Sequence, residues 1–192
     1  VPELVEYGTE VSGEAAAYMR PSFWPTTHDI LTPYMQFGGP AAWKLRAALA
    51  ATLVPTYGIY AGYELMESVA RPGAQEQIDN EKYQYKDRRW ADYEPGGERE
   101  SQSLAGWLTM LNRVRREHPS LRLLRNYVRH HVDDENLLAF SKMRRLPDGS
   151  TDAVIVVANL DPHSTRESTL RLDMATLGLP WEARLPVTDL VT

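Results

Sequence analysis

The hydrophobic pattern of this 192-residue chain changes its period near Pro119. Before that residue, apolar side chains recur at the three- and four-residue spacing of helices, most clearly over 103–118. After it, short alternating or β-branched runs are separated by turn signals such as Pro147-Asp148-Gly149. Because the period of apolar residues selects helix or strand, the last part of the chain is predicted to form an antiparallel β module.

The part before Pro119 alternates between predicted strands and helices. Helices are expected over 39–52 and 103–118, and the aromatic and β-branched run 56–65 predicts a buried strand leading into a loop. Gly58 and Gly62 in that run would allow close backbone approach. This order is typical of an α/β barrel or a doubly wound sheet. The strands expected in the tail are 126–131, 137–143, 153–158, 168–172 and 183–187.

Composition excludes several classes of protein and site. The chain is 43% apolar, enough for a sizeable core, yet it has neither an apolar run of about 20 residues nor a basic leader, so no membrane partner is expected. The absence of cysteine excludes disulfides and thiolate metal sites and fits a cytoplasmic protein. The net charge of −5 argues against nucleic acid. Arg113, Arg115 and Arg116 are expected on the solvated side of the second helix.

The run FWPTTHDIL, from Phe23 to Leu31, ends an apolar stretch in the adjacent pair His28 and Asp29. It shows no metal-ligand spacing, so no metal and no cofactor are expected there. One interpretation of the pair is recognition of a polar ligand or acid/base chemistry. The other is a helix N-cap aspartate with a hydrogen-bonded histidine beside it. The long polar, aromatic segment 71–100 favours a functional site nearby, because long loops in compact domains are usually functional.

Four segments carry a resemblance to the α-amylase superfamily, glycoside hydrolase family 13. Within it, the chain is similar to bacterial maltosyltransferases, which use α-maltose 1-phosphate to extend α-1,4-glucans. The resemblance covers the whole chain. The segments are EYGTE (6–10), YMRPSFWPTTHDILTPYMQFGGPAA (18–42), GIYAGYEL (58–65) and IDNEKYQYKDRRW (78–90).

The resemblance implies an α/β fold. Residues 1–120 would form the C-terminal units of a catalytic (β/α)8 barrel, and residues 121–192 an antiparallel β-sandwich domain that ends early. The family's nucleophile and acid/base carboxylates would precede Val1, so this chain would be a C-terminal segment, catalytically incomplete by itself. Its expected partners are the missing N-terminal part, α-maltose 1-phosphate and an α-1,4-glucan acceptor. The resemblance also implies a homodimer.

The resemblance also assigns roles to individual residues. Asp29 matches the superfamily's third essential carboxylate, which holds sugar hydroxyls of the donor ring and stabilises the transition state. His28 matches a substrate-binding histidine of typical amylases, a position where the maltosyltransferases more often have proline. Lys82 and Tyr83 match a pair that contacts the maltosyl donor, although a solvated lysine and a packing tyrosine are the ordinary alternative. Glu64 has two interpretations from its place alone: at the C-terminal end of the predicted strand it could face the site, but it is expected instead to fix neighbouring arginines or backbone.

Two other functions stay open at this point. One is a hydrolase or isomerase of the same superfamily, such as an amylase or trehalose synthase, which differs in the leaving group and the acceptor. The other is a non-catalytic carbohydrate-binding or assembly module, which would use the aromatic segment and the β tail.

Overall fold

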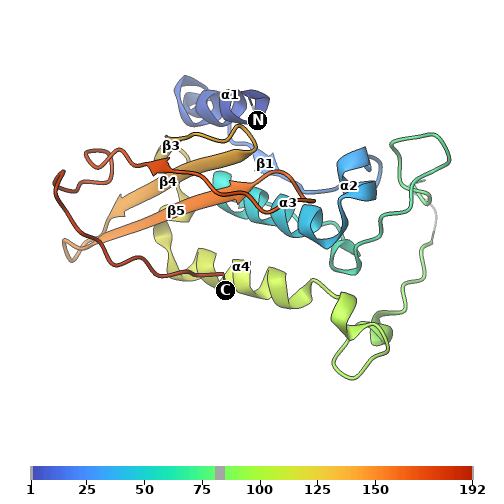
Figure 1. The fold of residues 1–192 in the computed structure, drawn as a ribbon. Helices are drawn as coiled ribbons and strands as arrows, with labels where there is room; N and C mark the ends of the chain where they lie inside the picture. Colours follow the sequence, from blue (N-terminus) through green and yellow to red (C-terminus); the bar gives the residue numbers. More distant parts are fainter. Residues whose placement is uncertain (1, 81–84, 192) are drawn as a thin grey trace.

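The chain forms helices and short strands up to residue 122 and an antiparallel sheet after it (Figure 1). The structure is a computed structural model that describes residues 2–80 and 85–191. Its helices and strands are α1 (Pro2–Ser12), β1 (Ser22–Phe23), α2 (Pro33–Phe37), α3 (Gly39–Leu53), β2 (Thr56–Tyr57), α4 (Ala105–Glu117), β3 (Tyr127–Val132), β4 (Leu137–Arg145), β5 (Thr151–Asn159) and β6 (Leu170–Arg171).

The two predicted helices are confirmed as α3 and α4. Helix α3 has proline in its first turn, where the missing backbone N–H costs no hydrogen bond, and it ends at Leu53, two residues before Pro55. Helix α4 buries Leu111 and Val114 from its apolar stripe. Leu111 packs with Trp43 and Ala51 of α3 in one core cluster. The stripe is therefore core, as its helical spacing predicts.

Strands β1 and β2 pair in parallel, with α2 and α3 between them in the chain. The buried strand expected within 56–65 is wrong in extent and burial. Only Thr56 and Tyr57 are strand, with Thr56 exposed, and the chain turns into a short 3-10 helix at Tyr63–Leu65. The reason is that, in the described ranges, β2 pairs with β1 alone, and a strand with one neighbour is not enclosed.

The predicted antiparallel β module is confirmed as a four-stranded sheet in the order β5-β4-β3-β6. Its longest pairing joins β4 to β5, in register from Leu137 opposite Asn159 to Arg145 opposite Thr151. The strand expected over 183–187 is wrong, because those residues are irregular and mostly exposed. Alternation alone does not make a strand, since a strand also needs a neighbour and a buried face.

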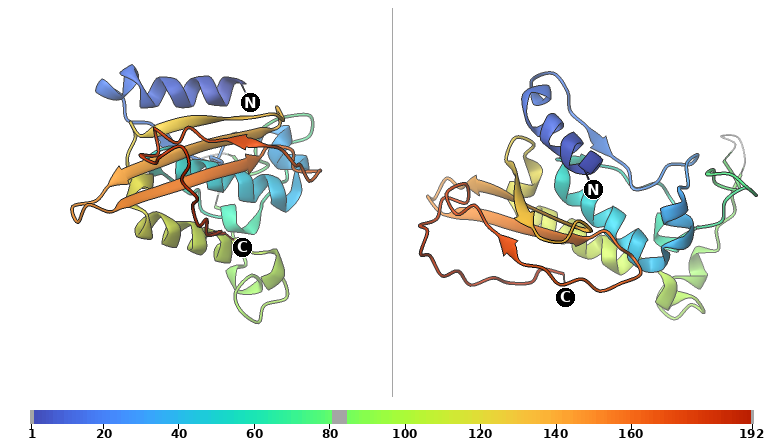
Figure 2. Two further views of the ribbon diagram at one scale, coloured as in Figure 1. Left: turned by 60° about the vertical axis from the view of Figure 1, so that its left-hand side comes forward. Right: turned by 45° about the horizontal axis from the view of Figure 1, so that its top comes forward.

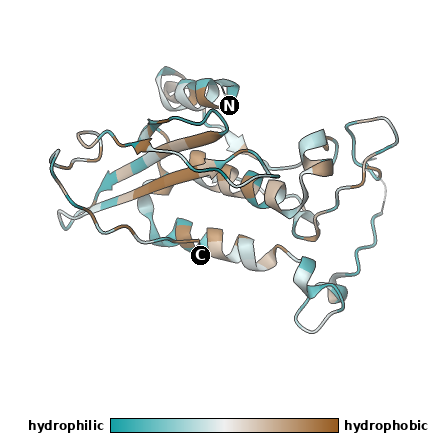
Figure 3. Cartoon of the chain, viewed as in Figure 1, coloured by the Kyte–Doolittle hydropathy of each residue, from teal (hydrophilic) through white to brown (hydrophobic). Residues whose placement is uncertain are grey.

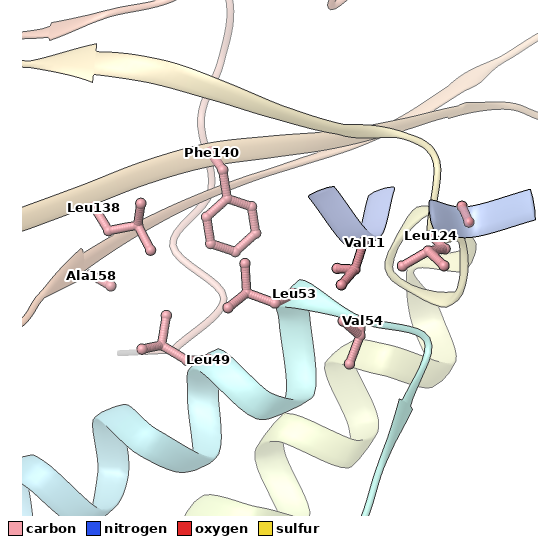
Figure 4. Packing of buried hydrophobic residues seen from close by; sticks show 9 residues of the cluster. Val11, Leu49, Leu53, Val54, Leu124, Leu138, Phe140 and Ala158 are labelled. Carbon is pink, nitrogen blue, oxygen red and sulfur yellow. The ribbon is translucent and has the colours of Figure 1, made fainter. Parts of the chain in front are cut away.

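The sheet and the helices share one hydrophobic cluster. Leu49 and Leu53 of α3 point at Leu138 and Phe140 of β4, as Figure 4 shows. Val11 of α1 joins the same cluster. In Figure 3 the hydrophobic colours gather along the strands and on the helices that pack near them. The division into domains at residue 120 stays a prediction, and any such domains are joined through this cluster.

Arg115 corrects the expectation of a solvated basic side on α4. Its guanidinium donates hydrogen bonds to the carbonyls of Ala51, Val54 and Pro55, the last at 2.7 Å, and lies 4.8 Å from the ring centre of Tyr57. Burial lowers its pKa, the nearby Tyr57 phenol opposes that shift, and the charge of Arg122 adds to it. Arg115 therefore satisfies the carbonyls at the end of α3 and ties α4 to β2.

The segment between β2 and α4 extends away from the sheet (Figures 1 and 2). It contains the described parts of the long polar, aromatic run noted in the sequence. Its first part returns to the residues after β1, because Ile30 and Glu76 form an antiparallel bridge. The elements thus bring the end of β1, the end of β2 and this long segment together.

Candidate functional site

The candidate site lies after the carboxyl ends of β1 and β2. His28 and Asp29 follow β1, which ends at Phe23, and Tyr60 follows β2, which ends at Tyr57. Because the two strands are parallel, both segments leave the same edge, where α/β proteins commonly bind ligands. The rings of His28 and Tyr60 have centroids 6.3 Å apart. The strand pair therefore brings a histidine, a carboxylate and a tyrosine together.

Backbone hydrogen bonds hold Asp29 in place while its carboxylate stays accessible. The Gln77 amide donates to the Asp29 carbonyl at 2.8 Å, and the Leu31 amide donates to the Gln75 carbonyl at 2.8 Å. Gln77 is itself buried. The side chains of His28 and Asp29 are 49% and 52% exposed, with Nε2 and Oδ1 3.1 Å apart. Such a pair can exchange hydrogen bonds with a polar ligand.

The helix-cap interpretation of Asp29 is wrong. Helix α2 begins at Pro33, and its N-cap residue is Thr32. Asp29 lies three residues before that cap, and its backbone instead pairs with the segment around Gln77. The Asp29 carboxylate therefore does not cap helix α2.

The predicted close approaches at Gly58 and Gly62 are confirmed. A Cβ on Gly58 would lie 2.3 Å from the Trp24 ring, so the indole packs directly on the backbone after β2. Gly62 has a φ of +97°, and a Cβ there would lie 2.4 Å from Nε of Arg88. Its amide also donates to the Glu64 carboxylate at 3.2 Å. Glu64 thus fixes backbone, one of the two roles expected of it.

Sequence reasoning missed Tyr60, Glu67 and Arg88. Arg88 forms an ion pair with Glu67 and lies 5.6 Å from the ring centre of Tyr60. Glu67 and Arg88 are 21 positions apart, so no short-range spacing signals the pair. The available signal was Gly62, because a glycine inside a run that predicts a strand can mark a place where another group comes too close for a side chain.

Lys82 and Tyr83 lie outside the described residues. In the described ranges, no cluster of three or more His, Cys, Asp or Glu side chains could hold a metal ion. None of the helices described there has the length and apolar character needed to cross a membrane.

A hollow of about 750 Å³ lies beside the β3–β4 turn. Three of its charged side chains, Asp133, Asp134 and Arg166, already pair with one another or with near neighbours. Arg166 contacts Asp134 at 3.6 Å and Asp161 at 2.5 Å, and Arg171 contacts Asp133 at 2.6 Å. We therefore assign the candidate site to the strand ends, where the carboxylate of Asp29 is accessible, and not to this hollow.

Comparison with known proteins gives the context of these residues. Residues 129–192 match a family model described as "GLGE, C-terminal". The chain is 52% identical over 191 residues to alpha-1,4-glucan:maltose-1-phosphate maltosyltransferase 2 of Streptomyces coelicolor. It is 51% identical over 194 residues to the maltosyltransferase of Arcanobacterium haemolyticum and 49% identical over 191 residues to maltosyltransferase 1 of Streptomyces coelicolor.

The chain is homologous to these maltosyltransferases. The three alignments cover 97–99% of the chain, so they include both the helical part and the sheet. They cover 27% of each relative, so the chain spans about a quarter of the length of the maltosyltransferases it matches. The resemblance to this group is thereby confirmed.

Proposed function

We propose that the chain is part of a retaining maltosyltransferase that moves maltosyl units from α-maltose 1-phosphate to the non-reducing end of α-1,4-glucan chains. The observation that carries this proposal is the accessible carboxylate of Asp29. The backbone of Asp29 is held by hydrogen bonds beyond the carboxyl edge of a parallel strand pair, in a chain homologous to maltosyltransferases. Barrel enzymes place their chemistry at that edge.

Asp29 would act on the donor sugar. Retaining transfer passes through an oxocarbenium-like transition state, first when phosphate leaves and again when the acceptor hydroxyl attacks. A carboxylate that accepts hydrogen bonds from the ring hydroxyls stabilises that state more than the ground state. The nucleophile and the acid/base residue, about 5 Å apart in retaining enzymes, would come from the rest of a (β/α)8 barrel. In this proposal β1 and β2 are two of its strands.

Lys82 and Tyr83 would bind the maltosyl unit of the donor. Their support is the family resemblance together with one feature of the described chain. Gln77, five positions before Lys82, donates its backbone N–H to the carbonyl of Asp29. The chain that leads to Lys82 therefore starts beside the candidate site. A lysine supplies three donors, and a tyrosine supplies a flat apolar face and a hydroxyl, which together suit a sugar.

Replacing Lys82 by alanine should weaken use of the donor. We expect kcat/KM for α-maltose 1-phosphate to fall by roughly 10- to 150-fold, which corresponds to about 1.5–3 kcal/mol for a hydrogen bond to a charged group. Initial-rate measurements on the complete enzyme that carries this chain would test this. Lys44→Ala is the matched control, because Lys44 lies on α3 over the ring of Trp107. A maltose-bound structure with Lys82 and Tyr83 turned away from the sugar would contradict the assignment.

One assay separates the proposed function from its alternatives. The complete enzyme is incubated with α-maltose 1-phosphate, with and without glycogen, while phosphate and maltose are measured. A maltosyltransferase releases phosphate and lengthens the glucan. A hydrolase would release maltose even when no glucan acceptor is present. The likeness of His28 to the histidine of typical amylases favours this alternative. A carbohydrate-binding module would bind maltose and leave the donor unchanged.

A further inference from the structure

Behind the candidate site, the Glu67 carboxylate receives two cations. Its Oε1 lies 3.1 Å from Nε of Arg88 and its Oε2 lies 3.1 Å from Nη2, a bidentate pairing that fixes the plane of the guanidinium. Nζ of Lys86 lies 3.1 Å from the same Oε2. The side chains of Glu67 and Arg88 are only 21% and 11% exposed. Water therefore screens this pairing less than it screens a surface ion pair.

Arg88 joins this carboxylate to the aromatic part of the site. It crosses directly over Gly62, where a Cβ would lie 2.4 Å from its Nε. Its guanidinium carbon is 5.6 Å from the ring centre of Tyr60. Burial lowers the pKa of Arg88, but hydrogen bonds to Glu67 and Tyr60 outweigh burial, and the pKa lies above its ordinary value. The orientation of Tyr60 is thus tied to the Glu67–Arg88 pair.

Tyr60 in turn packs against His28. The two rings are tilted by 53° with centroids 6.3 Å apart. His28 Nε2 is 3.1 Å from Oδ1 of Asp29. A continuous path of contacts therefore runs from Glu67 through Arg88, Tyr60 and His28 to Asp29.

We infer that Glu67 is a positioning residue, which through Arg88 and Tyr60 sets the orientation of His28 beside Asp29. This inference rests on the proposed function for its catalytic consequence. Two residues, Arg88 and Tyr60, separate Glu67 from His28, so Glu67 would not touch the donor. Its effect would be to hold the site in one geometry, which matters because displacing a reacting group by about 1 Å can cost about 100-fold in rate.

The charges of the cluster support a geometric role. Lys86 also contacts Asp79 at 3.4 Å, so Glu67 and Asp79 balance Lys86 and Arg88. Among the described residues these two carboxylates and two cations carry no net charge together, so they add little long-range field at Asp29. What the cluster provides is a bidentate ion pair of fixed geometry, which links the segment after β2 to the segment that leads toward α4.

The test is Glu67→Gln in the complete enzyme. The amide keeps the shape but removes the charge and one acceptor oxygen, so the bidentate pairing with Arg88 is lost. We expect kcat to fall by roughly 10- to 100-fold while KM for α-maltose 1-phosphate changes little, because positioning acts on the transition state. Glu67→Asp, which keeps the carboxylate, should restore part of kcat. Asp92→Asn is the control, since it breaks the Arg89–Asp92 pair of the same segment, at 3.2 Å.

A second measurement does not depend on activity. The ring of Tyr60 shifts the resonances of the His28 ring protons, so selectively labelled histidine reports the path directly by nuclear magnetic resonance. Glu67→Gln and Arg88→Lys should both move the His28 signals in the same direction as Tyr60→Leu, because lysine cannot form the two-point contact. Asp92→Asn should leave them in place.

The outcomes are distinguishable. If the wild-type enzyme releases no phosphate from α-maltose 1-phosphate, the proposed function fails, while the His28 signals still test the path. If phosphate is released but Glu67→Gln leaves both kcat and the His28 signals unchanged, the inference about Glu67 is wrong. If Glu67→Gln does not fold, Arg88→Lys decides the question by the same two measurements.

Discussion

Asp29→Asn is expected to reduce kcat of the complete enzyme by about two to three orders of magnitude and to leave its thermal unfolding unchanged. Asparagine keeps the shape of the side chain but lacks the negative charge that complements an oxocarbenium-like centre. Losing one such electrostatic group costs about 3–4 kcal/mol in the transition state. Because the change acts on the transition state, KM for the donor should change little.

The structure gives a reason why Asp29→Asn should not unfold the protein. The side chain is 52% exposed, and the bonds that hold the segment come from the backbone of residues 29 and 31. Asp148→Asn is the matched control, because Asp148 is an exposed aspartate in the β4–β5 turn, bonded to Ser150. Steady-state kinetics and a melting curve for both variants complete the test. Near-normal kcat in Asp29→Asn would show that this carboxylate has no part in the chemistry.

The spacing of apolar residues predicted those helices and strands that bury one regular apolar face. Helices α3 and α4 and the three strands from Tyr127 to Asn159 lie where the spacing of apolar residues indicates them. Helix α1 was not indicated, because what fixes it is a contact distant in the sequence. Its Gly8 lies against the Tyr127 ring of β3: a Cβ added at Gly8 would lie 3.4 Å from that ring. No property of residues 2–12 alone reveals that contact.

The candidate site divides in the same way. His28 and Asp29 could be found because they are adjacent and end an apolar run, and the strand pair places them at a ligand-binding edge. Tyr60 and the Glu67–Arg88 pair could not, because they meet only after the long segment beyond β2 has folded back. Arg115 shows the converse case. Its place on a polar helix face suggested solvation, but the end of α3 offers it three carbonyls.

Lys142 is expected to make the stability of the protein depend strongly on pH. It lies on β4 between Tyr127 of β3 and Val154 of β5, and it is fully buried. Its Nζ donates to the Leu123 carbonyl at 2.6 Å. Burial, with a smaller contribution from the charge of Arg115, lowers its pKa from 10.5 to about 7. Above neutral pH, Lys142 is therefore neutral in most folded molecules, but it is charged in the unfolded chain.

The sign of the effect follows from which state binds the proton. Between pH 7 and 10.5 the unfolded chain binds a proton at Lys142 that the folded chain has lost, so the free energy of unfolding rises with pH across that window. This contribution is complete above pH 10.5 and is lost as the pH falls to about 7. The full difference amounts to about 5 kcal/mol, at about 1.4 kcal/mol for each pKa unit.

Urea unfolding of wild type and Lys142→Met at pH 7, 8 and 9 tests this expectation. Methionine has a similar length and no charge, so it removes the titration but also the hydrogen bond to Leu123. The informative quantity is therefore how the difference between the two proteins changes with pH. The free energy of unfolding of wild type should rise by roughly 2–3 kcal/mol relative to that of Lys142→Met between pH 7 and 9. Arg144→Met, at an exposed position two residues further along β4, should show no such gain. Parallel pH curves for wild type and Lys142→Met would mean that Lys142 stays charged in the folded protein, its charge accommodated by the Leu123 carbonyl.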